Sequence, residues 1–222
     1  SQLSPRMGRA AFEAWLEGSR VDLILHAPEV ANLLGGFTGR ALATTDLEDL
    51  IAATPAGRTA PVRSRQSASV MVTSGTTGVP KGVAIRRRAD HPLAAVALAG
   101  ATRIRPGAPT LVWPPLYHGY GLAAAMLCLV VGSPVITASA LPRASLADGA
   151  GEAALAAIRQ YGVEVVFGVP AQLRALAGAL ERDRGPAPRL RAVLSGSDSL
   201  DPTTVAALQR TAARIGPAHI GG

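Results

Sequence analysis

Residues 69–85 read SVMVTSGTTGVPKGVAI, a polar, glycine-rich loop between two short apolar runs. The glycines in this loop leave backbone amides unshielded and permit positive φ angles, so several N–H groups can converge on one anion. The loop also carries four hydroxyl groups and one ammonium group, on Thr73, Ser74, Thr76, Thr77 and Lys81. Because amides, hydroxyls and an ammonium group are phosphate ligands, the stretch predicts a cradle for a polyphosphate.

Lys81 is the only lysine among 22 basic residues; all the others are arginine. A lysine offers a compact point charge on a flexible stem, and a planar arginine fork does not replace it against phosphate. The loop is not a P-loop of the Gly-x-x-x-x-Gly-Lys-Ser/Thr type, because Pro80 stands directly before the lysine. The alternative is a glycine- and threonine-rich hairpin turn without a ligand, which leaves the position of the sole lysine unexplained.

On both sides of the loop, short apolar runs alternate with Ala- and Leu-rich segments of helix length. The runs are continuous, which is typical of strands covered on both faces. Strands are predicted at 21–25, 70–73, 110–113, 134–137, 164–167 and 191–194. Helices are predicted at 6–16, 46–53, 92–101, 122–131, 151–160, 171–180 and 202–214. This alternation predicts an α/β fold in which helices cover both faces of a mostly parallel sheet.

The first residues of two helices are marked by a polar residue followed by proline, Ser4-Pro5 and Asp201-Pro202. Residues 54–61 have the composition of a surface linker. We therefore expect residues 1–60 to form the end of a first α/β lobe plus a linker, and residues 61–222 to form a second α/β lobe.

Composition excludes several classes of function. The 222 residues are 48% hydrophobic and carry a net charge of +7, but the arginines are scattered and the run Arg86–Arg88 has no interleaved aromatics, so we expect no nucleic-acid partner. Cys128 is the single cysteine, which excludes a disulfide framework and predicts a buried structural thiol. The longest uninterrupted apolar run, 122–131, is half of the roughly 20 residues that a membrane span needs. Residues 1–6 lack the pattern of a secretory signal, so a cytoplasmic location is expected.

The loop resembles the phosphate-binding signature of the adenylate-forming superfamily, at Ser74–Gly82. This superfamily holds acyl-CoA synthetases, fatty acyl-AMP ligases, luciferases and peptide-synthetase adenylation domains. Three further segments are similar to the superfamily in the same order: 114–121 to the Pro-x-x-His-x-x-Gly stretch beside the acyl pocket, 165–173 to a strand–Pro–helix segment, and 190–200 to the loop against the adenine. The chain is closest in character to bacterial fatty-acid–CoA ligases.

The resemblance implies a role for each matching residue. The ATP phosphates would be bound by Thr73, Ser74, Gly75, Thr76, Thr77, Gly78 and Lys81, and the catalytic residues would be Lys81 and His118. The acyl pocket would include Tyr117, His118, Gly119 and Tyr120, and the adenine would contact Gly196, Ser197, Asp198 and Ser199. No metal ligand is assigned.

His118 also has an interpretation from the residues alone. No Asp, Glu, Lys or Arg occurs between Pro106 and Pro142, and His118 lies in this stretch, preceded by Tyr117 and followed by Gly119 and Tyr120. That setting suits a carboxylate head at the mouth of an apolar pocket. The alternative is a histidine satisfied within the core.

The chain departs from the superfamily pattern in several places. Members have a larger N-terminal part, a Tyr-Gly-x-Thr-Glu motif, a ribose-binding Asp and a mobile C-terminal domain with a catalytic Lys, none of which occurs in these 222 residues. Ser197, Asp198 and Ser199 stand where Gly-Ala-Pro is common in the adenine loop, and Arg86 and Arg87 stand near a frequent histidine. We therefore expect this chain to be a piece of the large N-terminal domain, without the C-terminal domain. By itself it would lack full activity.

The implied activity is that of an AMP-forming acid–thiol ligase. ATP and a carboxylic acid, expected to be fatty or otherwise apolar, give an acyl adenylate, and coenzyme A then takes the acyl group. Mg²⁺ would bridge the phosphates. The alternatives are a fatty acyl-AMP ligase that loads a phosphopantetheine carrier protein, or a degenerate, non-catalytic binding module. Serine hydrolysis at Ser197-Asp198-Ser199-Leu200 is disfavoured, because the glycine that starts such a motif is missing and only His219 lies downstream as a base.

Overall fold

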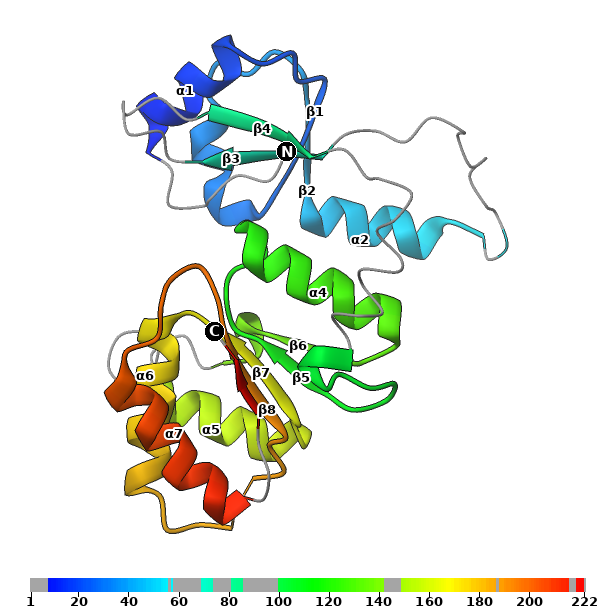
Figure 1. Cartoon of the computed structure of the whole chain (residues 1–222). Coiled ribbons are helices and arrows are strands. Elements are labelled where there is room, and N and C mark those ends of the chain that lie inside the picture. The colour runs from blue at the N-terminus through cyan, green and yellow to red at the C-terminus, as the bar shows by residue number, and fades with distance from the viewer. Residues whose placement is uncertain are drawn as a thin grey trace. The chain divides into compact units, whose positions relative to one another are not determined.

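The computed structural model describes residues 8–55, 57, 69–73, 81–85, 100–141, 149–186, 188–215 and 219–221. The chain forms two compact units, Ser1–Arg87 and Arg88–Gly222, drawn in Figure 1. The division between the two compact units falls after residue 87. The lobe boundary expected near residue 60 remains a prediction.

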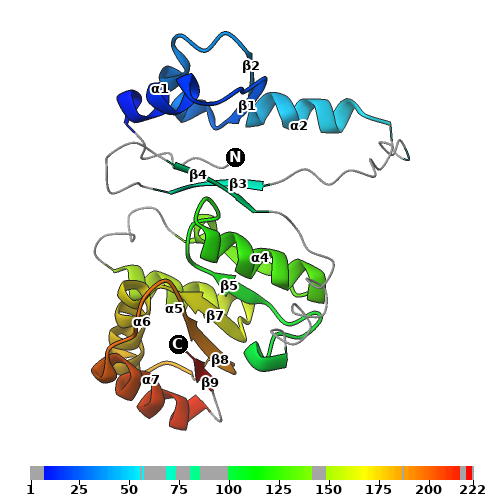
Figure 2. The same ribbon diagram turned by 45° about the horizontal axis from the view of Figure 1, so that its top comes forward.

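The first unit contains two separate pairs of strands. Its elements are α1 (Arg9–Glu17), β1 (Leu23–His26), the 3₁₀ helix η1 (Pro28–Leu34), β2 (Arg40–Ala43), α2 (Thr44–Ala53), β3 (Ser69–Thr73) and β4 (Lys81–Ile85). β1 and β2 are parallel, whereas β3 and β4 form an antiparallel pair, seen side by side in Figure 2. The strand predicted from residue 70 is therefore confirmed, and β2 was not predicted, because its sequence RALA is short and not β-branched.

One expectation for the first unit is wrong, and another lies outside the described residues. The first helix begins at Arg9, after an extended backbone at Gly8 (φ −68°, ψ 157°), and the predicted Ser4-Pro5 start lies outside the described residues. The strand β1 is not covered on both faces, since Leu23 and Leu25 are 50% and 54% exposed. In α1, Phe12 and Trp15 are buried.

The second unit is built on a five-stranded, fully parallel sheet with the order β6-β5-β7-β8-β9. Its strands are β5 (Thr110–Val112), β6 (Val135–Thr137), β7 (Val165–Gly168), β8 (Ala192–Ser195) and β9 (His219–Gly221). Its helices are α4 (Gly119–Val131), the 3₁₀ helix η2 (Ala138–Ala140), α5 (Ala150–Tyr161), α6 (Pro170–Arg182) and α7 (Pro202–Ile215). These strands and helices agree with the predicted ones within a few residues, except η2 and β9, which were not predicted. The helix expected at 92–101 lies mostly outside the described residues.

Helices cover both faces of this sheet (Figure 1). On one face, Val112, Phe167 and Leu194 pack against α4. On the other face, strand residues such as Leu111 and Val166 pack against α5, α6 and α7. Successive strand residues therefore enter opposite cores, which is why the apolar runs in the sequence are continuous. The predicted α/β fold with a parallel sheet and helices on both faces is confirmed.

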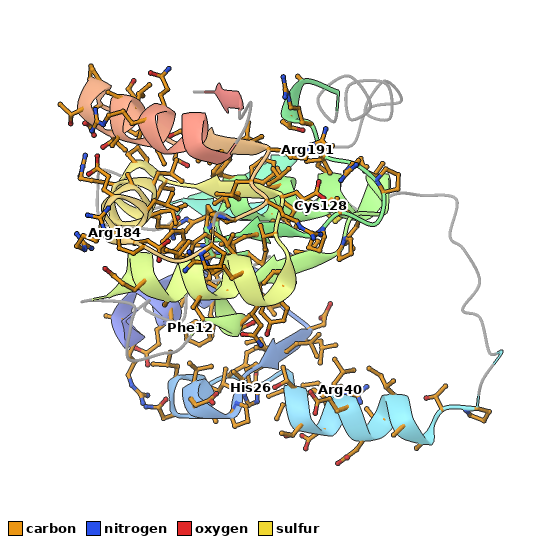
Figure 3. All side chains as sticks on the ribbon, turned by 90° about the horizontal axis from the view of Figure 1, so that it is seen from below. Phe12, His26, Arg40, Cys128, Arg184 and Arg191 are labelled. Atoms are coloured by element: carbon orange, nitrogen blue, oxygen red, sulfur yellow. The ribbon has the colours of Figure 1, made fainter. Side chains whose placement is uncertain are left out.

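Cys128 lies in the core between α4 and the sheet. Its side chain is fully buried, and Figure 3 shows it among the side chains inside the second unit. Burial raises the pKa of its thiol, while hydrogen bonds from Thr110 and Ser133 oppose that shift. A buried thiol with a raised pKa is not a nucleophile, so the predicted structural role is confirmed.

Among the described residues, no helix is both long and apolar enough to cross a membrane.

Candidate functional site

The carboxyl ends of the three central strands of the second unit lie next to one another. The amide of Trp113, after β5, donates a 3.1 Å hydrogen bond to the carbonyl oxygen of Phe167 in β7. The amide of Gly196, after β8, donates a 3.3 Å bond to the carbonyl oxygen of Gly168. Open α/β sheets bind ligands outside the carboxyl ends of their strands. The predicted acyl-pocket segment follows β5 and the predicted adenine loop follows β8, so both begin at this edge.

His118 precedes the first residue of α4 at this edge. Its backbone is extended, its amide donates to the carbonyl oxygen of Pro115 at 3.0 Å, and its carbonyl oxygen accepts the amide of Leu122 at 3.0 Å. The side chain is exposed, and its ring lies against that of Tyr117, with 4.7 Å between the centroids. The alternative of a histidine satisfied within the core is therefore wrong. His118 presents an exposed imidazole beside the amino end of α4, where the helix dipole favours a carboxylate.

Tyr120 connects the acyl-pocket segment to the adenine loop. Its hydroxyl donates a 3.1 Å hydrogen bond to the carbonyl oxygen of Leu194, and its ring meets that of Phe167 edge-on, with centroids 6.0 Å apart. A Cβ atom added to Gly196 would lie closer than 3.0 Å to three atoms of the Tyr120 ring. Burial raises the pKa of Tyr120 to about 12. The phenol is thus a neutral hydrogen-bond donor packed on the glycine that opens the adenine loop.

Gly121 fixes the start of α4. A Cβ atom at this position would lie closer than 3.0 Å to the carbonyl oxygens of Pro114 and Pro115, so only glycine allows this approach of helix and loop. Gly119, in the same segment, is the first residue of the helix. The four predicted acyl-pocket residues, 117–120, therefore span the end of the loop and the first two residues of α4.

The adenine loop combines one buried polar atom with an exposed rim. The Oγ atom of Ser195 is buried and has no hydrogen-bond partner within the described part of the chain. Ser197 has a φ of 74°, a left-handed conformation that favours glycine, and the carboxylate of Asp198 accepts the amide of Ser199 at 2.7 Å. Residues 197–199 are exposed. An orphaned hydroxyl beside an exposed polar loop fits a planar, polar ligand such as adenine.

Gln172 is a residue of this edge to which the sequence analysis gave no role. Its Oε1 atom accepts the amide of Val169 at 3.0 Å, and its Nε2 donates to the carbonyl oxygen of Trp113 at 3.4 Å. The side chain therefore links the first turn of α6 to the end of β5. One sequence signal could have predicted this role. Gln172 stands two residues after Pro170, the first residue of the helix, and glutamine at this position often caps a helix.

Asp201 caps α7, as the sequence predicted. Its carboxylate accepts the amide of Thr204 at 2.9 Å and the hydroxyl of Thr204 at 2.8 Å, and Arg174 of α6 donates to it at 2.9 Å. The hydroxyl of Thr203 is a further donor and the largest cause of the lowered pKa of Asp201. The cap holds α7 against α6 immediately after the adenine loop.

The predicted phosphate loop belongs to the first unit, and most of it lies outside the described residues: Ser74, Gly75, Thr76, Thr77 and Gly78. The two strands that flank it are described. Thr73 and Lys81 are opposite each other in the antiparallel register of β3 and β4, so the loop begins and ends at one end of this pair. The phosphate-loop hypothesis and its alternative, a hairpin turn without a ligand, both predict that a hairpin connects these two strands. The register of β3 and β4 therefore does not decide between them.

No group of three or more His, Cys, Asp or Glu that could hold a metal ion occurs in the described ranges. Mg²⁺ remains an expectation from the resemblance.

Similarity to known proteins extends over most of the chain. A family model described as AMP-binding enzyme matches residues 2–220. Feruloyl-CoA synthase of an Amycolatopsis species is 29% identical over 178 residues, and 2-succinylbenzoate–CoA ligase of Bacillus licheniformis is 28% identical over 195 residues. These matches cover 79% and 87% of this chain but 34% and 38% of the relatives, so the chain spans little more than a third of their length.

Solved structures share the fold. The N-terminal domain of FACL13 from Mycobacterium tuberculosis superposes with a TM-score of 0.79 at 18% identity, over 99% of this chain and 54% of that one. The O-succinylbenzoate coenzyme A synthetase MenE of Bacillus subtilis, in complex with AMP, gives a TM-score of 0.68 at 22% identity, over 98% and 52%. From the family model and this fold together, the chain belongs to the AMP-binding, adenylate-forming enzymes and corresponds to part of their N-terminal domain.

Proposed function

We propose that this chain takes part in the ATP-dependent activation of a carboxylic acid to an acyl adenylate, followed by transfer of the acyl group to coenzyme A. The observation that carries the proposal is the contact of Tyr120 with Leu194 and Gly196, because it joins the acyl-pocket segment to the adenine loop. An acyl adenylate needs its acyl and adenine parts bound side by side. The two CoA ligases among the relatives support coenzyme A as the acceptor.

The proposed first step is attack of a carboxylate oxygen on the α-phosphorus of ATP. The bond between the α-phosphorus and the oxygen that links it to the β-phosphorus breaks, and pyrophosphate leaves with the electron pair. We assign the β- and γ-phosphates to Thr73, Lys81 and the loop 74–78, because amides, hydroxyls and an ammonium group stabilise the charge that develops on the leaving group. Mg²⁺, when bound, would neutralise part of the same charge.

The proposed position of the acid is beside His118. This imidazole is exposed, and the amino end of α4 follows it directly, so both the side chain and the helix dipole favour an anionic head group there. In the second step, the thiol of coenzyme A attacks the acyl carbon and AMP leaves. The body of the acid would be apolar, because the segment around His118 carries no charge to pair with a charged substrate.

The proposed position of the adenine is the loop from Gly196 to Ser199. The buried hydroxyl of Ser195 lies at the base of this loop and lacks a partner among the described residues, so it is available to a ring nitrogen or an amino group. The exposed backbone around Ser197 would contact the ring. This loop therefore supplies the polar contacts, and Tyr120 supplies the apolar ones.

Calorimetry of the 222-residue protein tests this function. The probe is propionyl-sulfamoyl adenosine, a stable analogue of an acyl adenylate, compared with AMP and with propionate. We expect the analogue to bind at least about 100-fold more tightly than AMP, because it resembles the reaction intermediate and fills both subsites. Gly196→Val should weaken its binding, while Gly100→Ala, a position with no atom within 4 Å of an added Cβ, should not. An analogue that binds no better than AMP, or not at all, contradicts the proposal.

A further inference from the structure

The parallel ladder between β5 and β7 is interrupted at its carboxyl end by the side chain of Gln172. Up to that point the pairing is regular: Val112 lies opposite Phe167, and the amide of Trp113 donates to the carbonyl oxygen of Phe167 at 3.1 Å. In an evenly spaced parallel ladder the next bond would run from the amide of Val169 to the carbonyl oxygen of Trp113. Both groups bond to Gln172 instead: its Oε1 accepts the Val169 amide at 3.0 Å, and its Nε2 donates to the Trp113 oxygen at 3.4 Å. A side-chain amide thus takes the place of one backbone hydrogen bond.

The helix end that carries Gln172 is fixed, because the first turn of α6 packs tightly on the end of β7. Leu173, the next residue, is fully buried, and its amide donates to the carbonyl oxygen of Val169 at 3.0 Å. A Cβ atom added to Gly168 would lie 2.6 Å from the Cδ2 atom of Leu173, so this glycine allows the close approach of helix and strand. Gln172 therefore extends from a fixed base, and the chain that it holds is the one that follows Trp113.

The segment 114–118 that follows Trp113 begins with two prolines. They carry no amide hydrogen, so neither can continue the ladder as a donor. The segment therefore leaves the sheet at the carbonyl oxygen of Trp113, and Gln172 supplies the donor to that oxygen. At its other end the segment closes on itself, because the amide of His118 donates to the carbonyl oxygen of Pro115 at 3.0 Å. A change in the bond to Trp113 would consequently shift the segment as a piece, together with His118.

Resting on the proposed function, which assigns the carboxylate of the acid to His118, we infer that Gln172 is a positioning residue for the acid. It stands between the ends of β5 and β7 and thereby sets where the segment 114–118 lies. It acts through the backbone of Trp113. The adenine loop is attached by a different bond, from the amide of Gly196 to the carbonyl oxygen of Gly168. Binding of the acyl group should therefore depend on Gln172, and binding of AMP should not.

Gln172→Glu separates the two ends of the side-chain amide. Glutamate still accepts the amide of Val169 and is as common a capping residue at this position as glutamine, so α6 should keep its first turn. An ionised carboxylate has no hydrogen to donate, so it loses the bond to Trp113 and repels the carbonyl oxygen there. Gln172→Leu removes both bonds. Gln209→Glu introduces the same charge at an exposed glutamine of α7 and is the matched control.

Calorimetry of the 222-residue protein with propionyl-sulfamoyl adenosine and with AMP tests the inference. In Gln172→Glu and in Gln172→Leu we expect the Kd of the analogue to rise at least about fivefold, the effect of one lost hydrogen bond, while the Kd of AMP changes less than about twofold. Gln209→Glu should leave both dissociation constants unchanged. If Gln172→Leu does not fold, Gln172→Glu still decides, because it keeps the cap of α6.

The outcomes separate the inference from the proposed function. An analogue that binds Gln172→Glu as tightly as it binds the natural protein would overturn the inference and leave the proposed function intact. Equal losses for the analogue and for AMP would also overturn the inference, since a purely structural role of Gln172 affects both ligands alike. If the natural protein binds the analogue no more tightly than AMP, the proposed function fails and the inference fails with it.

Discussion

The hydroxyl of Tyr120 donates a hydrogen bond of 3.1 Å to the carbonyl oxygen of Leu194, 74 residues later in the chain. Tyr120 is the second residue of α4, and Leu194 belongs to the strand that leads into the adenine loop. The bond therefore joins the segment of the second unit that the resemblance assigns to the acid and the segment that it assigns to the adenine. Their proximity follows from the parallel sheet, which brings the carboxyl ends of β5, β7 and β8 to one edge.

The contact between Tyr120 and Gly196 predicts a non-additive pair of mutations. Gly196→Ala should destabilise the protein by about 1–3 kcal/mol, because the new Cβ atom overlaps with the ring. In a Tyr120→Ala background the same change should have an effect smaller than about 0.5 kcal/mol, since the overlapping atoms are gone. Urea unfolding of the four proteins measures the coupling, with Gly100→Ala as the control. Additive effects would show that the two residues are not in contact.

The pKa of Tyr120 predicts how stability depends on alkaline pH. Burial raises this pKa to about 12, whereas an unfolded tyrosine titrates near pH 10. Between these values the folded protein holds a proton that the unfolded chain loses, so the contribution of Tyr120 to stability is complete below about pH 10 and declines as the pH rises.

Absorbance of phenolate during an alkaline titration measures this directly. Tyr120 should ionise in a late phase, at a pH well above that of a free tyrosine. Tyr120→Phe should remove the late phase, and Tyr161→Phe should leave it in place. The absence of a late phase that depends on Tyr120 would show that its phenol is not buried in the folded protein.

The assignment of Lys81 to the β- and γ-phosphates predicts a selective loss of affinity. Lys81→Ala should weaken the binding of ATP and of pyrophosphate by about tenfold or more, the effect of one lost charge-assisted contact, and that of AMP much less. Arg184→Ala removes one positive charge from an exposed position on the second unit, labelled in Figure 3, and is the matched control. Calorimetry gives the three dissociation constants for each protein. Equal losses for ATP, pyrophosphate and AMP would assign Lys81 a structural role.

The fold of the second unit could be predicted because its signals are local. Continuous apolar runs indicated β5, β7 and β8, and Asp201-Pro202 marked the start of α7 because the carboxylate caps the helix. The failures lie where local signals are weak. β2 and β9 are short segments, of four and three residues, that are strands only because a parallel neighbour pairs with them.

The candidate site could be predicted only as separate segments. His118 and Gly196–Ser199 were found by resemblance, but their common edge depends on strand order, which no single segment encodes. The packing of Tyr120 on Gly196 joins two distant positions and has no sequence signature. Ser197 stands where glycine is common in the superfamily, and its φ of 74° gives the physical reason for that preference.

Hydrogen exchange with and without propionyl-sulfamoyl adenosine tests most directly the claim that the ligand binds at the carboxyl edge of the parallel sheet. The claim predicts slower exchange on binding in the peptides that contain residues 114–122 and 194–200, which carry Tyr120 and Gly196. Peptides at the opposite edge, 103–109 and 189–191, should exchange at the same rate in both states. Protection confined to that opposite edge, or no change at 114–122 and 194–200 when the protein is saturated with the analogue, would contradict it.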